Sequence, residues 1–155
     1  MAGEPYDLLY AEYGSLGVAD AANVPGGRVA PATWTDPDGS LWMLGGWGWD
    51  AVGWKKGQLG DLWRLDPASG QWAWMAGPTR IDKPGACGTP GVDDLPATRS
   101  GAAVWQEAGG RVWLFGGWGN SCVDSPGSGP LNDLWTATAY GSRGALSRRV
   151  RPRRP

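Results

Sequence analysis

The sequence contains no histidine, a single phenylalanine and only two cysteines among its 155 residues. Without histidine the chain holds neither a Ser-His-Asp nor a Cys-His catalytic arrangement, and it offers no imidazole to a metal ion. The cysteines, Cys87 and Cys122, lack the spacing of a zinc or redox motif. We therefore expect no enzymatic activity, no metal and no cofactor in these residues.

Long apolar runs are also missing, since none approaches the ~18 residues needed to cross a bilayer. Residues 1–17 lack the charged start and apolar middle of a secretory signal. We therefore expect a soluble chain, and the sequence assigns it no compartment.

No acidic residue follows Asp133, whereas six arginines do. A basic tail can attract nucleic acid or an anionic membrane. This tail has no amphipathic period and no interleaved aromatic residue beyond Tyr140. We therefore expect a solvated, disordered tail over residues 139–155, with neither nucleic acid nor membrane as a partner.

What the chain has in abundance is glycine, proline and tryptophan, with 27, 13 and 12 residues respectively. Many glycines and prolines indicate many turns, whereas many tryptophans indicate a large buried apolar surface rather than disorder. Short strands joined by such turns are typical of all-β sandwiches, barrels and propellers.

The chain contains two copies of one repeat of roughly 70 residues, a length that points to a repeat architecture. The aligned pairs are residues 25–28 with 96–99, Trp34 with Trp105, 41–48 with 112–119, and 59–63 with 131–135. Many of the matched positions are tryptophan or glycine, so the similarity is not accidental.

The first copy reads as four antiparallel strands, at about residues 30–34, 41–44, 61–65 and 71–75. Turns rich in Asp, Pro and Gly separate the first strand from the second and the third from the fourth. The second strand is continuously apolar, as expected where both faces are covered, and we expect Gly45-Gly46 to end it. Four antiparallel strands of this kind form one propeller blade.

These residues resemble the kelch repeat. The resemblance rests on an apolar strand ending in Gly-Gly, an Asp-Leu-Trp strand, and then Gly-x-Trp, at residues 41–46, 61–63 and 70–72. The second copy shows the first two parts at residues 112–117 and 131–135. The resemblance covers roughly residues 25–138 and implies a β-propeller whose blades usually bind other proteins.

Some features depart from the family pattern. Leu65 stands where the family commonly has tyrosine, and the repeat exceeds the ~50 residues of a kelch blade because of two long loops, residues 47–59 and 76–96. No Gly-x-Trp follows the third strand of the second copy.

We accordingly predict an all-β, partial kelch-type propeller with one complete four-stranded blade and one incomplete blade. The expected divisions are an N-terminal loop segment (1–24), the first repeat with its inter-blade loop (25–95), the incomplete second repeat (96–138) and the basic tail (139–155). Since propellers close with about four to eight blades, we expect the chain to be part of a larger propeller, a truncated gene product or a piece that oligomerises.

In a four-stranded meander both long loops emerge at the same end of the blade, and loops on a rigid scaffold are common binding sites. The candidate binding residues there are Trp47, Trp49, Asp50, Trp54 and Trp118. The tryptophans can form a platform for a protein, a glycan or a cation. Alternatively, they fold back and cover the end of the blade. Because Trp118 repeats Trp47, that pair favours a structural role, whereas Trp49 and Trp54 have no counterpart.

Cys87 and Cys122 fall in the two long loops of the second copy, and therefore at the same end of one blade. A disulfide between them and two free thiols are both compatible with this placement. The Asp36-x-Asp38-Gly39 run lacks the further ligands of a calcium loop, so we interpret it as a turn.

The leading functional hypothesis is a kelch-type scaffold that binds a protein through the long-loop end. The first alternative is carbohydrate binding by the loop tryptophans. The second is a remnant of a galactose-oxidase-like enzyme, a class with a kelch-like propeller, although its copper site requires histidine ligands, which this chain does not contain.

Overall fold

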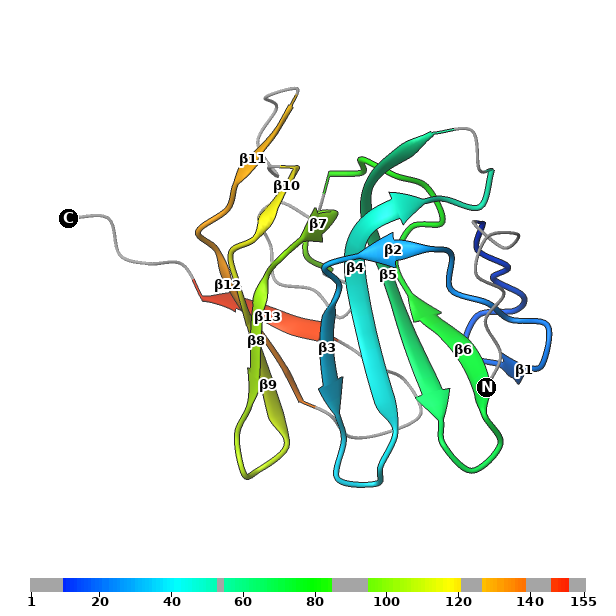
Figure 1. Ribbon diagram of the computed structural model, residues 1–155. Coiled ribbons are helices and arrows are strands. Elements are labelled where there is room, and N and C mark those ends of the chain that lie inside the picture. Colours follow the sequence, from blue (N-terminus) through cyan, green and yellow to red (C-terminus); the bar gives the residue numbers. More distant parts are fainter. Residues whose placement is uncertain (1–9, 53–54, 85–94, 121–126, 139–145, 151–155) are drawn as a thin grey trace.

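The chain forms an all-β structure that resembles part of a propeller, as the sequence predicts (Figure 1). The computed structural model describes residues 10–52, 55–84, 95–120, 127–138 and 146–150, and every regular element within them is a strand. Within this part of the chain, no helix is long and apolar enough to span a membrane.

The first sheet, which we call blade 1, has the strand order β1-β6-β5-β4-β2, with β3 also paired to β4. Its strands are antiparallel to their neighbours. They are β1 (Ala19–Asp20), β2 (Arg28–Val29), β3 (Ala32–Thr35), β4 (Leu41–Trp49), β5 (Lys56–Asp66) and β6 (Gln71–Ala76). Strands β3 to β6 follow one another in a meander, and these are the four strands expected of a complete blade.

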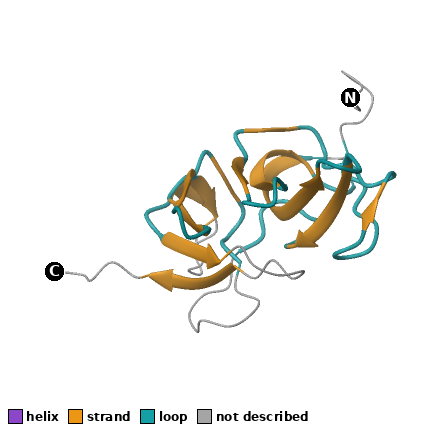
Figure 2. Cartoon of the chain, turned by 90° about the horizontal axis from the view of Figure 1, so that it is seen from below, coloured by secondary structure: helices purple, strands orange, loops and turns teal. Residues whose placement is uncertain are grey.

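The second sheet, blade 2, has the order β13-β12-β9-β8, and a small third sheet of order β11-β10-β7 lies at its long-loop end. Figure 2 shows the two blades side by side, viewed along the strands from below. The strands of blade 2 are β8 (Ala103–Gln106), β9 (Arg111–Phe115), β12 (Leu134–Thr138) and β13 (Leu146–Val150). Those of the third sheet are β7 (Arg99–Ser100), β10 (Trp118–Asn120) and β11 (Ser128–Pro130).

The expectation of disorder from residue 139 onward is wrong for Leu146–Val150, which form β13 along the edge of β12. The physical reason is that an unpaired strand edge presents free N–H and C=O groups, which even a polar segment can satisfy through its backbone. Blade 2 thus has a fourth strand although it lacks a Gly-x-Trp sequence. Residues 139–145 and 151–155 of the predicted tail lie outside the described residues.

Strand β4 does not end at Gly45-Gly46, contrary to the expectation from the sequence. Both glycines have positive φ, 64° and 105°, and the pairing with β5 shifts register between Leu44 and Gly46. Because the glycines absorb this bulge, the ladder resumes and continues to Trp49 opposite Lys56. Most of the predicted loop of residues 47–59 is therefore a hairpin.

The tight turns follow the sequence chemistry closely. In the first, the Asp38 carboxylate accepts the Ser40 N–H at 2.9 Å, and in the second the Asp66 carboxylate accepts the Ala68 N–H at 2.9 Å. Such Asx contacts replace backbone hydrogen bonds in turns. The run from Asp36 is thus a turn, as predicted.

Side chains alternate between the two faces of each blade. We call one the front face, which carries Ala32, Trp42, Leu44 and Leu62 in blade 1 and Ala103, Trp105, Trp113 and Phe115 in blade 2. The opposite, back face carries Met43, Trp63, Trp72 and Trp74 in blade 1 and Val104, Val112, Leu114 and Trp135 in blade 2.

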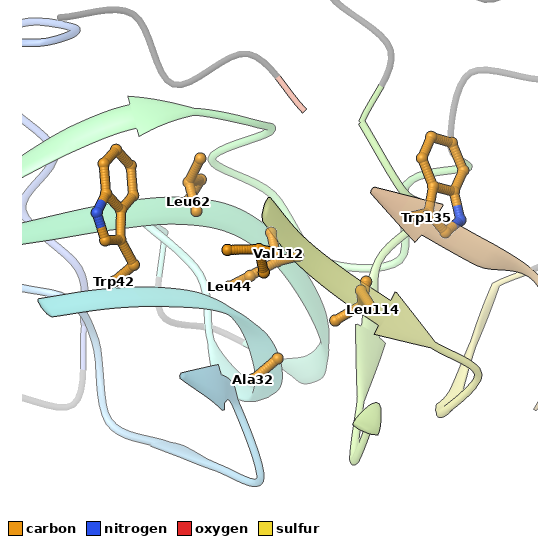
Figure 3. Packing of buried hydrophobic residues seen from close by; sticks show 7 residues of the cluster. All are labelled: Ala32, Trp42, Leu44, Leu62, Val112, Leu114 and Trp135. Carbon is orange, nitrogen blue, oxygen red and sulfur yellow. The ribbon is translucent and has the colours of Figure 1, made fainter. Parts of the chain in front are cut away.

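The main core lies between the front face of blade 1 and the back face of blade 2, and Figure 3 shows its side chains coming from both sheets. Its buried members are Ala32, Trp42, Leu44, Leu62, Val112, Leu114 and Trp135. Gln106 of blade 2 adds a hydrogen bond across the interface, from its Nε2 to Asp36 Oδ1 at 3.4 Å. The repeats therefore pack face to face, as successive blades of a propeller do.

A second core covers the back face of blade 1. There, Ala11 and Tyr13 pack with the buried Trp63, and Met43, Trp72 and Trp74 surround them. Residues 10–24, which we call the N-terminal cap, are held by the pairing of β1 with β6 and by a bridge between Glu12 and Val24. Part of the segment expected to be loop thus belongs to the blade.

The Gly-Gly bulge gives a direct test of this architecture. A Cβ on Gly46 would lie 2.9 Å from the Val29 carbonyl oxygen at an already unfavourable φ of +105°. We expect Gly46→Ala to lower the free energy of unfolding by about 2–4 kcal/mol, because strain and overpacking add. Urea denaturation measures the change.

The matched control is Gly70→Ala in the turn before β6. Gly70 also has positive φ, +67°, but a Cβ there meets nothing within 4 Å. The control should lose only about 1 kcal/mol, the conformational part alone. Equal losses in the two variants would contradict the bulge described for β4.

Candidate binding surface

The two long loops of the repeat lie together at one end of blade 1, as the meander topology predicts. The described part of the second loop runs along the first: Ala51 N–H donates to the Thr79 carbonyl at 3.2 Å, and Asp82 N–H donates to the Gln58 carbonyl at 2.9 Å. In Figure 1 this end is uppermost, opposite the tight turns. The sequence predicts the binding residues at this end.

Trp47 and Trp118 occupy equivalent, exposed positions at this end. Trp47 lies on β4 opposite Val29 of β2, and Trp118 lies on β10 opposite Ser100 of β7. Their exposed fractions are 41% and 52%, and Val29 is exposed as well. The repeated pair therefore presents indole surface to solvent, although repetition alone favoured a structural role.

Trp49 is half-buried rather than an open platform. The Tyr10 ring packs perpendicular to it, with centroids 5.8 Å apart. The Lys56 ammonium lies over the Trp49 ring at 4.9 Å and over the Trp47 ring at 5.6 Å. Since Trp47 and Trp49 lie two residues apart on one strand, a single lysine from the paired strand reaches both.

The Asp50 carboxylate is buried and engaged within the protein. It accepts the Val52 N–H at 3.0 Å and the Ile81 N–H at 3.5 Å, and so helps to join the two long loops. Trp54, Cys87 and Cys122 lie outside the described residues. Of the five predicted binding residues, the structure thus brings Trp47, Trp49 and Asp50 into one hairpin and places Trp118 on β10, in the small third sheet at the long-loop end of blade 2.

A buried ion pair supports the exposed tryptophan in each blade. Arg28 at the start of β2 donates from both terminal nitrogens to Asp61 of β5, at 2.6 and 2.8 Å. Its Nη1 also donates to the Gly45 carbonyl at 3.0 Å, and its Nε donates to the Gly26 carbonyl at 3.1 Å. One side chain therefore fixes the backbone just before Trp47.

The second blade repeats this arrangement closely. Arg99 donates to Asp133 at 2.7 and 2.8 Å, to the Gly116 carbonyl at 2.9 Å and to the Ala97 carbonyl at 3.0 Å. The arginines that recur at the start of each repeat are therefore internal anchors, because their guanidinium groups donate to a carboxylate and to backbone carbonyls of the protein itself.

In each blade an indole N–H donates a further hydrogen bond to the carboxylate of the ion pair. Trp63 Nε1 donates to Asp61 at 2.7 Å, and Trp135 Nε1 donates to Asp133 at 2.6 Å. The Asp-Leu-Trp spacing, which occurs in both copies of the repeat, places the donor two residues beyond its acceptor, on the same side of the strand. In blade 1 the Tyr13 hydroxyl of the N-terminal cap adds a further donor, 2.9 Å from Asp61.

These networks shift two pKa values in opposite directions. Burial by itself raises the pKa of Asp133, but the hydrogen bonds and charge of Arg99, with the Trp135 N–H, outweigh it and hold that pKa below its usual range. Burial, followed by the charge and hydrogen bond of Asp61, strongly raises the pKa of the Tyr13 hydroxyl.

Sequence reasoning missed three contributors to this end of the molecule: Lys56, Tyr10 and Val29. Of these, only Lys56 could have been found from the sequence, because a hairpin over this segment places it opposite Trp49. Among the residues that the structure describes, no group of three or more His, Cys, Asp or Glu side chains can hold a metal ion. This end of the molecule can therefore offer a ligand an apolar surface and the Lys56 ammonium, on backbone that the buried arginines hold in place.

The Asp133 carboxylate should make stability depend on acid. Because its folded-state pKa is depressed, its contribution is fully present above the unfolded value of about 3.9 and is lost as pH falls through the folded pKa. We expect Asp133→Asn to cost about 3 kcal/mol at pH 7, since it leaves Arg99 buried without its partner. In urea titrations the difference in the free energy of unfolding between Asp133→Asn and the unsubstituted chain should become smaller below about pH 4.

Glu107→Gln is the control for this substitution, because the Glu107–Arg111 pair in the same blade is exposed and spans 3.9 Å. Its loss should stay below about 1 kcal/mol. A pH-independent gap for Asp133→Asn would contradict an ionised, arginine-bound carboxylate.

The Tyr13 hydroxyl should make stability depend on alkali. Since its pKa is raised on folding, the folded chain retains a proton that the unfolded chain releases above about pH 10, and stability falls as pH rises beyond that point. We expect Tyr13→Phe to lose about 1.5–3 kcal/mol at pH 7 with the hydrogen bond to Asp61, and to flatten the alkaline decline. Thermal unfolding across pH 7–11 measures both, and Tyr10→Phe, on the same segment but exposed, should leave the stability at pH 7 unchanged.

No model of a protein family matches the chain, and no curated protein matches its sequence. The chemistry of the surface itself is therefore the basis for assigning a function.

Proposed function

We propose that this chain is a kelch-type protein-interaction scaffold, part of a larger β-propeller, and that it binds a protein through the long-loop end. The observation that carries the proposal is the pair of equivalent, solvent-facing indoles, Trp47 and Trp118, on strands fixed by buried ion pairs. Tryptophan is one of the three residues, with tyrosine and arginine, that are enriched at the energetic centres of protein interfaces.

The surroundings of Trp47 favour a partner of particular chemistry. Val29 extends the apolar surface beside the indole, and Lys56 places a positive charge over it. An apolar side chain flanked by a carboxylate satisfies both features: the first covers the indole, and the second pairs with the ammonium. The partner we propose therefore presents an acidic, partly apolar segment.

A rigid frame strengthens this assignment. Each exposed tryptophan lies two residues beyond the carbonyl that the buried arginine holds, Gly45 for Trp47 and Gly116 for Trp118. A side chain held in place before binding loses little conformational entropy on association. The repeated anchoring thus suits recognition better than it suits a mobile surface.

Carbohydrate binding is the second candidate, and it centres on Trp118. Lys56 already lies over the rings of Trp47 and Trp49, so a stacked sugar would compete there with the lysine. Trp118 is exposed, and the Ser128 hydroxyl lies 3.3 Å from its Nε1, which provides a polar group beside an open ring. The two candidate functions therefore differ in which tryptophan contributes most to binding, Trp47 for a protein and Trp118 for a carbohydrate.

The test uses the full chain with a photo-crosslinking amino acid in place of Val29. The protein captured in cells is identified, purified and titrated against variants of the unsubstituted chain. We expect Trp47→Ala and Lys56→Glu each to weaken binding by about thirtyfold or more, as loss of an interfacial hot spot of about 2 kcal/mol does.

Trp105→Ala serves as the matched control, because Trp105 is an equally exposed indole on the front face of blade 2. It should leave the affinity unchanged. Binding that survives Trp47→Ala and Lys56→Glu would overturn the proposal. Binding on a glycan array that is lost with Trp118→Ala, without any captured protein, would replace it with the carbohydrate candidate.

A further inference from the structure

The front face of blade 2 is an open copy of a surface that is covered in blade 1. Leu44 and Phe115 occupy the same repeat position, yet Leu44 is 2% exposed and Phe115 is 46% exposed. The indole pairs behave alike: Trp34 stacks on Trp42 at 5.9 Å, and Trp105 stacks on Trp113 at 6.3 Å. Trp105 is 46% exposed, whereas its counterpart Trp34 is half-buried, and Trp113 is half-buried, whereas its counterpart Trp42 is 7% exposed.

What covers this surface in blade 1 is known from the structure. The back face of blade 2 supplies Val112, Leu114 and Trp135, with Val104 beside them. At the edge of this interface, the Asp36 carboxylate accepts one hydrogen bond from Trp42 Nε1 at 2.8 Å and another from Gln106 Nε2 of the next blade. In blade 2 the Glu107 carboxylate accepts Trp113 Nε1 at 2.7 Å in the same way. A back face that covers such a surface thus supplies apolar and aromatic side chains, with a polar side chain at the edge.

The back face of blade 1 has that chemistry but is occupied by the N-terminal cap. Tyr13 lies between Trp63 and Trp74, with ring centroids 5.1 and 5.2 Å away. Asn23 holds the cap against β6 by donating to the Trp72 carbonyl at 2.8 Å. Trp135, which matches Trp63 in the repeat, is instead covered by the neighbouring blade. The cap therefore takes the place of a blade.

We propose that the open front face of blade 2 docks on the back face of blade 1 of a second copy of this chain, and that the N-terminal cap competes with this docking. The contact repeats the interface already present between the two blades, because equivalent repeat positions of a front face and a back face meet in both. Thr35, which matches Gln106 in the repeat, then faces Glu107 across the new interface. Lifting the cap exposes the only surface of the second copy that matches the known cover, among the residues described.

Docking of this kind joins unlike faces, so each added copy again presents an open front face. Such an assembly either extends or closes into a ring. Because propellers close with about four to eight blades, rings of two-bladed chains contain about two to four copies. This inference is independent of the partner proposed for the long-loop end.

The experiment measures assembly of the full chain by sedimentation velocity in the presence of a reductant. We expect the unsubstituted chain to be mainly monomeric, because the cap is tethered to the face that it covers. Tyr13→Ala loosens the cap but leaves Asp61 bound to Arg28 and Trp63, and we expect it to form species of about two to four copies. If Tyr13→Ala fails to fold, as judged by near-ultraviolet circular dichroism, Asn23→Ala serves in its place.

Two additions identify the surfaces that meet. Adding Trp105→Lys to the Tyr13→Ala chain places a charge on the front face and should restore the monomer, whereas adding Trp118→Lys, on an equally exposed indole at the long-loop end, should not. A synthetic peptide of residues 10–24 should dissolve the Tyr13→Ala assemblies, and the same peptide with Tyr13→Ala should act at least tenfold more weakly.

A folded Tyr13→Ala or Asn23→Ala chain that stays monomeric at high concentration overturns the proposal. So do assemblies that persist with Trp105→Lys, since they would use another surface. Assembly by the unsubstituted chain that is insensitive to the peptide also overturns it, because the cap then plays no part. None of these outcomes bears on binding through Trp47, so failure here and failure of the proposed function are separate.

Discussion

Each blade is organised around a buried arginine–aspartate pair that joins the start of the repeat to its third strand. Arg28 and Arg99 each bind a carboxylate with two nitrogens and hold backbone carbonyls with the rest of the guanidinium. Burying both charges is costly, and only a geometry that satisfies every donor offsets that cost. Because the pair spans the sheet, the Gly-Gly bulge, the tryptophan beyond it and the third strand are positioned together.

The same carboxylate connects the blade interior to whatever covers its back face. Asp61 accepts hydrogen bonds from Arg28, from Trp63 and from Tyr13, so the cap is joined to the anchor of the blade through one side chain. Asp133 accepts from Arg99 and Trp135, and the neighbouring blade covers that indole. A tyrosine on a short segment and a complete blade are thus alternative covers for one kind of surface.

The long-loop end and the front face of blade 2 both expose aromatic side chains, but for different structural reasons. At the long-loop end, exposed indoles stand on backbone that internal ion pairs hold rigid, which suits recognition of a different molecule. On the front face of blade 2, exposed aromatics belong to a packing surface whose counterpart exists within the chain, which suits a repeat of the same kind. Exposure alone does not separate these roles. The internal repeat does, since it shows which positions are covered elsewhere in the molecule.

The sequence by itself determined the central parts of strands β3 to β6, the tight turns and the repeat, because these depend on local spacing of apolar residues, Gly, Asp and Pro. It also placed the long loops at one end, which follows from the meander. Only the tertiary structure decided that β4 passes through Gly45-Gly46, that Leu146–Val150 pair with β12 and that Tyr13 covers Trp63. These features depend on which strand edge or sheet face is left open for a distant segment. Such an opening is a property of the assembled sheets, and no local pattern encodes it.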